Sequence, residues 1–262
     1  EAGNMSGTFL PASDRSILEA ISRITYCNPF LPGRHELEQE ILGSKFRQPD
    51  VSARDLSSFS TNLGRLHDVA RHHAEKARQA FYQVQGRVDR VEFRIYQDVV
   101  HFALFSSNRE PFLEFIRKGY TRGNADRACP FYKDFETEHA RYFPLRPGLP
   151  ECDYEASHIF AMFFQIRRAF YHIFEFIIGT SRASNRLRAR IWQSIFTHDM
   201  ARYQRSLYDR IGDIVTFITG PSGSGKELVA RAIGLSRFIP FDADRLHFEE
   251  DFLNSFIPVN LS

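Results

Sequence analysis

The sequence predicts a mainly α-helical N-terminal region followed by the first part of an α/β domain. Apolar residues recur at three- and four-residue intervals through the first half of the chain, where strand-like alternation is nearly absent. Towards the C-terminus, a β-branched and aromatic run at 214–218 precedes a glycine-rich turn and an apolar run at 228–233, as in a strand, turn and helix. We assign residues 1–182 to the helical region and residues 183–262 to the α/β part.

Length and composition are those of an ordinary globular protein. The 262 residues allow one or two domains, and 43% hydrophobic and 25% charged residues are typical of soluble proteins. The net charge of +2 neither favours nor excludes binding to nucleic acid. Cys27, Cys129 and Cys152 are odd in number and lack Cys-x-x-Cys spacing, so we expect no disulfide framework and a cytoplasmic location.

Two short helices are predicted first. Ser13 is a suitable N-cap for a helix that extends to Ile24. A turn at 28–33 follows, because it contains two prolines and a glycine. The second helix spans 34–42, and Gly43 ends it.

Longer helical patterns come next. A helix is predicted at 51–84 and another at 88–102, from their three- and four-residue apolar spacing. Pro111 is expected to open a further short helix, since a missing N–H is harmless at a first helical position. Residues 119–155 are rich in proline and glycine, and we expect one helical piece there, at 131–142.

The most apolar stretch of the chain is 159–178. It contains polar and charged residues at Gln165, Arg167, Arg168, His172 and Glu175. Charges in the middle of a membrane span are costly, so we expect no transmembrane helix. A seam with alternating steps of four and three comprises Ile159, Phe163, Ile166, Phe170, Ile173 and Ile177. This helix either lies in the core of the N-terminal region or mediates self-association.

The small and polar residues 179–185 form the best linker candidate. Arginines beside this linker form either a solvated helix face or a contact for phosphate or a partner: Arg182, Arg186, Arg188 and Arg190. A further helix is predicted at 199–211, leading into the strand at 214–218.

The glycine-rich turn carries the strongest chemical signal in the chain. Its Gly-x4-Gly-Lys spacing is that of a phosphate-binding loop, in which backbone N–H groups converge on phosphate oxygens and Lys226 adds a positive charge. The following helix presents further N–H groups and the positive end of its dipole. The predicted nucleotide-binding residues are Gly220, Pro221, Ser222, Gly223, Ser224, Gly225, Lys226 and Glu227.

Glu227 departs from the general pattern, which has Ser or Thr there to bind magnesium. Residues 220–233 nevertheless closely resemble the Walker A segment of the AAA+ domain in sigma-54-dependent transcriptional activators, the bacterial enhancer-binding proteins. That family typically has Gly-Glu-Ser-Gly-Thr-Gly-Lys-Glu and then Leu-Val-Ala-Arg-Ala-Ile, so its glutamate matches Glu227. Pro221 and Ser224 differ from it. Residues 256–262 look like the next strand of the family, and the resemblance covers roughly the last quarter of the chain.

The resemblance implies an ATP-binding transcription regulator that remodels the sigma-54 RNA polymerase holoenzyme through ATP hydrolysis. It also implies ATP and Mg²⁺ as cofactors, self-association as a dimer and a higher oligomer, and DNA binding only through a C-terminal domain. By position, Ile195 and Phe196 would line the adenine pocket. In that family the Walker B acids, which help to bind Mg²⁺, and the arginine finger come later in the chain. We therefore expect this chain to bind ATP without hydrolysing it alone. We also expect both of its ends to be truncated, because it starts at Glu1 and stops inside an apparent strand.

Two other functions stay open. The chain could be another P-loop protein, such as a small-molecule kinase or a transport ATPase, although the long helical region and Glu227 argue against this. It could also be a helical sensor or dimerisation module whose nucleotide loop is vestigial.

No metal site and no nucleophilic catalytic motif are predicted. His72 and His73 are adjacent on a helix and so point in different directions. Cysteines and histidines further along have the ligand types for zinc, but their spacing matches no compact zinc finger: Cys129, His139, Cys152 and His158. A Gly-x-Ser-x-Gly nucleophile elbow is absent from the sequence.

Overall fold

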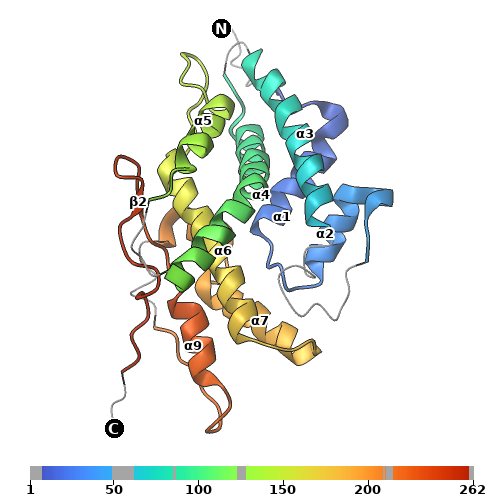
Figure 1. Ribbon diagram of the computed structural model, residues 1–262. Helices are drawn as coiled ribbons and strands as arrows, with labels where there is room; N and C mark the ends of the chain where they lie inside the picture. The colour runs from blue at the N-terminus through green and yellow to red at the C-terminus, as the bar shows by residue number, and fades with distance from the viewer. Residues whose placement is uncertain are drawn as a thin grey trace.

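The computed structural model describes residues 8–48, 62–84, 87–122, 128–208, 210 and 215–259 (Figure 1). These residues are mainly helical, which confirms the predicted helical character. The helices are α1 (Arg15–Tyr26), α2 (Gly33–Leu42), α3 (Leu63–Tyr82), α4 (Arg90–Arg122), α5 (Tyr132–Tyr142), α6 (Ala156–Phe176), α7 (Arg182–Ile195), α8 (Met200–Arg202) and α9 (Lys226–Gly234). Short 3-10 helices η1 (Ala12–Asp14) and η2 (Gly43–Lys45), a π-helix η4 (Tyr203–Leu207) and strands β1 (Phe241–Asp242) and β2 (His247–Phe248) complete the elements.

Helices α4 and α6 form the centre of the molecule (Figure 1). Helices α1 and α3 pack against α4, and α2 bridges α1 and α3. On the other side, α5, α7 and α9 pack against α6, together with the hairpin of β1 and β2. The two strands pair antiparallel, with Phe241 opposite Phe248.

Helix α6 lies in the core. This was one of the two alternatives predicted for the apolar stretch at 159–178. Ile159 and Ile173 are fully buried within the chain, and Phe163 is 5% exposed. None of the helices among the described residues is sufficiently long and apolar to cross a membrane.

Several predicted boundaries are confirmed because the signals are local. Helix α2 ends at Gly43, whose φ of 51° lies in the left-handed region that glycine adopts at low cost. Helix α5 also lies where the sequence predicted a helical piece. Of the helix predicted at 51–84, the structure has Leu63–Tyr82, and residues 51–61 lie outside the described part of the chain.

The prediction that Pro111 opens a new helix is wrong. Pro111 lies inside α4, which continues to Arg122. A proline within a helix removes one backbone hydrogen bond and costs about 3 kcal/mol. Phe112 and Ile116 are fully buried just beyond it, so packing of this segment against the core offsets that cost.

In place of the single helix predicted at 199–211, the chain forms a short α-helix and then a π-helix. Asp199 caps the short α8 by accepting a hydrogen bond from the Arg202 N–H at 2.9 Å. The chain then continues as the π-helix η4, with a backbone bond from Tyr208 N to Tyr203 O. Residue 211 lies outside the described part of the chain.

The strands predicted at 214–218 and 256–262 are also not formed by the residues that the structure describes, and Ile214 and residues 260–262 lie outside them. Residues 215–218 have no regular secondary structure, and Val215 and Phe217 are 90% and 87% exposed. Residues 256–259 likewise form no strand, and Ile257 is 78% exposed. A strand requires a neighbour for its N–H and C=O groups. Among the described residues, the sheet consists of β1 and β2, which pair with each other.

Residues on both sides of position 182 share one core. Phe248 of β2 stacks on Phe164 of α6 with ring centroids 3.9 Å apart, and Phe252 packs edge-on against the same ring. The C-terminal segment is thus packed against the N-terminal helices. The division into 1–182 and 183–262 stays a prediction from the sequence.

Candidate functional site

The predicted phosphate-binding loop is an exposed turn that leads directly into α9. Gly223 and Gly225 have φ angles of 73° and 82°, which side-chain-bearing residues rarely adopt. The Ser224 N–H donates to Pro221 O at 3.3 Å, and the Ser224 hydroxyl donates to the same oxygen at 2.8 Å. Gly225 is the N-cap of α9. The glycines therefore supply the tight turn that the motif requires.

Lys226 folds back over this turn. Its ammonium donates to the carbonyl oxygens of Gly220 at 2.9 Å and Pro221 at 2.8 Å. Neutral carbonyl oxygens are weaker partners for an ammonium than the charged oxygens of a phosphate. The lysine is thus held at the mouth of the loop by bonds that an anion could replace.

The Glu227 carboxylate is engaged within α9. That group pairs with Arg231 one helical turn later at 2.8 Å, and its side chain is 66% exposed. A carboxylate in the first turn of a helix is also favoured by the helix dipole. The observed role of Glu227 is therefore that of an exposed ion pair on α9.

The other end of α9 is fixed to the core helix α6. The buried Arg168 donates to the carbonyl oxygens of Leu235 and Arg237, the former at 3.0 Å. Gln165 donates to Ser236 O at 3.0 Å. Burial lowers the pKa of Arg168 to about 9, so the guanidinium stays charged at neutral pH and faces the negative end of the α9 dipole.

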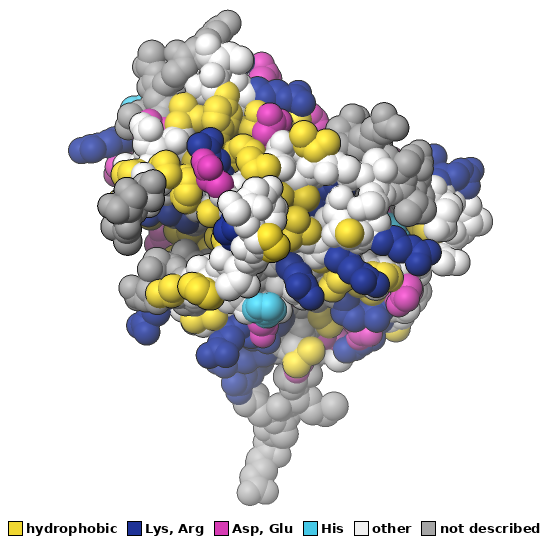
Figure 2. Space-filling view, turned by 90° about the horizontal axis from the view of Figure 1, so that it is seen from below, with side chains coloured by type: hydrophobic (Ala, Val, Ile, Leu, Met, Phe, Trp, Pro, Cys, Tyr) yellow, Lys and Arg dark blue, Asp and Glu magenta, His cyan; other side chains and the backbone are white. Residues whose placement is uncertain are grey.

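Surface charge around this end of the molecule is mixed. Helices α7 and α9 lie at the bottom of Figure 1, and Figure 2 views the molecule from that side. Lys and Arg side chains are spread over this face, with Asp and Glu side chains between them. An approaching triphosphate would therefore meet positive as well as negative side chains on this face.

Ile195 and Phe196, the predicted adenine-contacting pair, are each 1% exposed. Phe196 packs against Trp192 with ring centroids 4.5 Å apart and against Tyr203 at 5.3 Å. They belong to the same buried cluster as Ala232 of α9. The structure thus brings them close to the helix that follows the loop, but an adenine ring would have to displace core aromatics to reach them.

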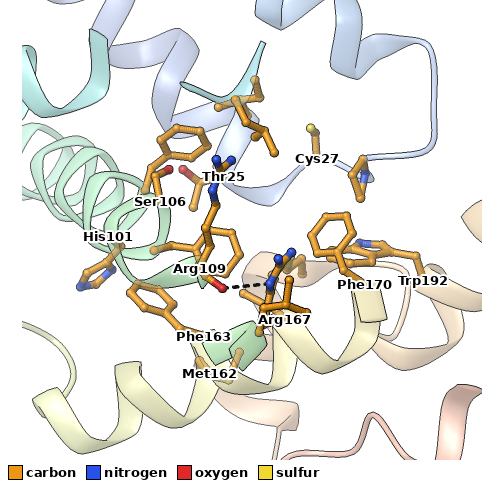
Figure 3. Close-up of a pocket in the computed structure, with 18 of the residues that line it drawn as sticks. Thr25, Cys27, His101, Ser106, Arg109, Met162, Phe163, Arg167, Phe170 and Trp192 are labelled. Atoms are coloured by element: carbon orange, nitrogen blue, oxygen red, sulfur yellow. Dashed lines mark hydrogen bonds between the residues drawn. The ribbon is translucent and has the colours of Figure 1, made fainter. Parts of the chain in front are cut away.

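A cavity of about 290 Å³ lies on another face of α6. Its walls come mainly from α1, α4 and α6, with Trp192 of α7 at one end (Figure 3). Phe105, Phe163 and Phe170 supply aromatic surface. Arg167 reaches across to α4, where its Nε donates to Arg109 O at 3.0 Å.

Arg167 is the unusual residue of this cavity. It is 6% exposed, its nearest carboxylate is that of Glu110 at 3.7 Å, and burial lowers its pKa to about 10. A mostly buried guanidinium beside aromatic rings suits a small ligand that carries an anionic group. From the sequence, Arg167 only argued against a membrane span. A charged residue within the most apolar stretch was the signal that could have identified it.

The four cysteines and histidines with zinc-ligand character do not form one group. Cys129 lies where its N–H donates to Leu246 O at 2.8 Å, and the His158 ring stacks on Tyr154. His139 and Cys152 do lie together, with His101 as a third member. His101 falls in a predicted helix with no cysteine or histidine close to it in sequence, so spacing rules could not include it.

Comparisons with protein-family models, with curated proteins and with solved structures gave no match to this chain.

Proposed function

We propose that this chain binds ATP through residues 220–227 and is part of a transcription regulator of the sigma-54-dependent activator class. The observation that carries the proposal is the position of the Lys226 ammonium over an exposed glycine turn at the start of α9. In such a loop, phosphate oxygens replace the two carbonyl partners of the lysine and accept bonds from backbone N–H groups.

The loop has room for this exchange. A Cβ atom placed on Gly223 would meet no atom within 4 Å, so the turn is open there. Ser222 is exposed and offers a further hydroxyl donor, and the Ser224 hydroxyl would become available by exchanging its bond to Pro221 O. Glu227 is engaged with Arg231, so a magnesium ion that accompanies ATP would take its protein ligands from outside the loop.

The regulatory part of the proposal rests on helix α6. One face of α6 contributes Phe163 and Arg167 to the cavity, and Arg168 on the same helix holds the C-terminal end of α9. A ligand that shifts α6 would therefore act on the helix that begins at the phosphate-binding loop. In the full-length protein, we propose that such a signal controls ATP hydrolysis, oligomer assembly and action on the sigma-54 RNA polymerase holoenzyme.

One binding experiment separates the helical module with a vestigial loop from the two functions that bind nucleotide. A fluorescent ATP analogue is titrated into the wild-type chain, into Lys226→Ala and into Lys133→Ala as a matched control on α5. We expect the wild type and Lys133→Ala to bind equally, and Lys226→Ala to bind at least about tenfold more weakly, since a charge-assisted contact contributes about 1.5–3 kcal/mol. Equal binding by all three chains, or no binding by any, would favour the helical module with a vestigial loop.

Assays of ATP hydrolysis and of phosphoryl transfer then separate the activator from a kinase or a transport ATPase. We expect the chain of 262 residues to bind the analogue without releasing phosphate. Release of phosphate that depends on Lys226, or transfer of the γ-phosphoryl group from ATP to an added small-molecule acceptor, would contradict the activator assignment and support a complete enzyme of another P-loop class.

A further inference from the structure

Three metal-ligating side chains meet inside the helical region. His101 comes from α4, His139 from α5, and Cys152 from the segment between α5 and α6. Their ligand atoms all lie within 4.8 Å of one another, and Cys152 Sγ lies 3.8 Å from His101 Nε2. Ligands on one tetrahedral zinc ion are about 3.4–3.8 Å apart, as its bond lengths of about 2.0–2.3 Å require. The trio needs only small adjustments to surround an ion.

Burial distinguishes this group from the exposed clusters that are common on protein surfaces. His101 and His139 are 3% and 7% exposed, and Cys152 is half-buried. The Nε2 atom of His139 is buried without a hydrogen-bond partner. An unsatisfied buried polar atom costs about 1–3 kcal/mol, so a ligand that satisfies it stabilises the fold.

The protonation states of the two imidazoles favour a cation. Burial lowers the pKa of His101 to about 3 and that of His139 to about 4, so both rings are neutral near pH 7 and have a lone pair available. Burial also raises the pKa of the Cys152 thiol to about 12. Without a cation, therefore, this thiol keeps its proton.

Gln97 holds the segment that carries Cys152. Its Oε1 accepts hydrogen bonds from the Cys152 thiol at 3.4 Å and from the Asp153 N–H at 2.9 Å. Its Nε2 donates to Asp153 Oδ2 at 3.0 Å. Groups that orient metal ligands in this way are a regular part of metal sites.

We propose that His101, His139 and Cys152 form a buried zinc-binding site. Two imidazole nitrogens and one thiolate are ligands that zinc prefers and that magnesium and calcium do not, so the site is separate from any nucleotide magnesium. Binding forms two Zn–N bonds and one Zn–S bond, breaks the S–H bond of Cys152, and releases that proton to water. Water or a small ligand takes the fourth position, as is usual for zinc with three protein ligands.

This site would tie α4, α5 and the loop before α6 to one point. His101 also borders the cavity, with its ring at the edge of the view in Figure 3. Zinc would therefore fix one wall of the cavity. This inference does not depend on the nucleotide proposal, because the three ligands belong to α4, α5 and the segment before α6, and none belongs to residues 220–227 or to α9.

The test uses the complete chain, stripped of metal with a chelator and titrated with Co²⁺. We expect one cobalt ion per chain, a thiolate-to-cobalt charge-transfer band in the near ultraviolet, and loss of that band when Zn²⁺ is added. Cys152→Ser should abolish the band, and His139→Asn should weaken zinc binding about 100-fold or more. Cys27→Ser is the matched control, since Cys27 is a half-buried cysteine outside the trio, and it should leave the band intact.

If a variant fails to fold, metal uptake and proton release by the wild type alone still test the site. Zinc added to the metal-free chain in weak buffer should release one thiol proton for each ion bound. The proposal is overturned if the wild type takes up no stoichiometric Co²⁺ or Zn²⁺. It is also overturned if uptake occurs without the thiolate band or without proton release.

Discussion

His172 is a buried residue whose charge state is tied to folding. Its Nε2 lies 2.8 Å from the Tyr120 hydroxyl and its Nδ1 lies 3.1 Å from the Ser236 hydroxyl, while the side chain is fully buried. Burial, with a further contribution from the charge of Arg168, lowers its pKa from 6.5 to about 3. The imidazole is therefore neutral in the folded chain at any pH above about 4.

We predict that His172 makes the folded chain less stable in acid. Below its unfolded pKa of 6.5 the unfolded chain binds a proton that the folded chain does not, so stability falls as the pH drops towards 3. The contribution lost between neutral pH and about pH 4 is on the order of 3 kcal/mol. Urea unfolding at several pH values should show a shallower pH dependence for His172→Gln than for the wild type. Identical slopes would mean that His172 does not titrate on unfolding.

For single residues, the sequence reveals the residue type but not its neighbours in space. Lys226 could be identified because its partners lie within six positions of it in the chain. His101 could not, because His139 and Cys152 reach it only after three separate segments have packed. Arg167 was noticed for its charge, while its place beside a cavity follows from the packing of α4 and α6.

Two glycines at helix starts are predicted to respond to alanine in opposite directions. Gly225 has a φ of 82°, so a Cβ there is strained, and Gly225→Ala should destabilise the chain by about 1–2 kcal/mol and weaken ATP binding. Gly64 lies in α3 with nothing within 4 Å of an added Cβ. Gly64→Ala should stabilise it by about 0.5–1 kcal/mol.

Thermal or urea unfolding of both variants measures these effects, and the ATP analogue reports on the loop. Equal stability of the Gly225→Ala variant and the wild type would show that the turn has another conformation in solution. Reduced stability of the Gly64→Ala variant would show that its added methyl group meets a neighbour.

For whole elements, a local signal was reliable only where packing or strand pairing did not override it. Gly43 ends α2 as predicted, because a left-handed residue after a helix is a property of a few adjacent positions. Pro111 is a local signal that burial of Phe112 and Ile116 overrides. The strand predicted at 214–218 failed for another reason, since its composition suits a strand but a strand also needs a partner.

On the scale of the molecule, α6 is the element that connects the others. Phe163 and Arg167 line the cavity, Arg168 holds the end of α9, and Phe164 stacks on the β2 residue Phe248. A single helix thus contacts the cavity, the loop-bearing helix and the C-terminal hairpin. Such an arrangement favours cooperative unfolding, because the loss of α6 packing removes the support of all three.

We predict that the regions on either side of position 182 unfold together. Phe248 of β2 is 5% exposed and stacks on Phe164 of α6, so Phe248→Ala should lower the free energy of unfolding by about 3–5 kcal/mol. Phe217 is 87% exposed, and Phe217→Ala is the matched control, expected to change it by less than about 0.5 kcal/mol. Far-UV circular dichroism follows the helices, and fluorescence follows Trp192, the single tryptophan of the chain, which lies in α7.

If α6 joins the two regions into one cooperative unit, both signals should change in a single transition, and Phe248→Ala should move both to lower urea concentration by the same amount. Separate transitions, with only one shifted by the variant, would instead show that residues 1–182 and 183–262 are independently stable. The distinction matters for the proposed regulation, because a ligand in the cavity would act on α9 through α6 only while α6 is folded and packed against both.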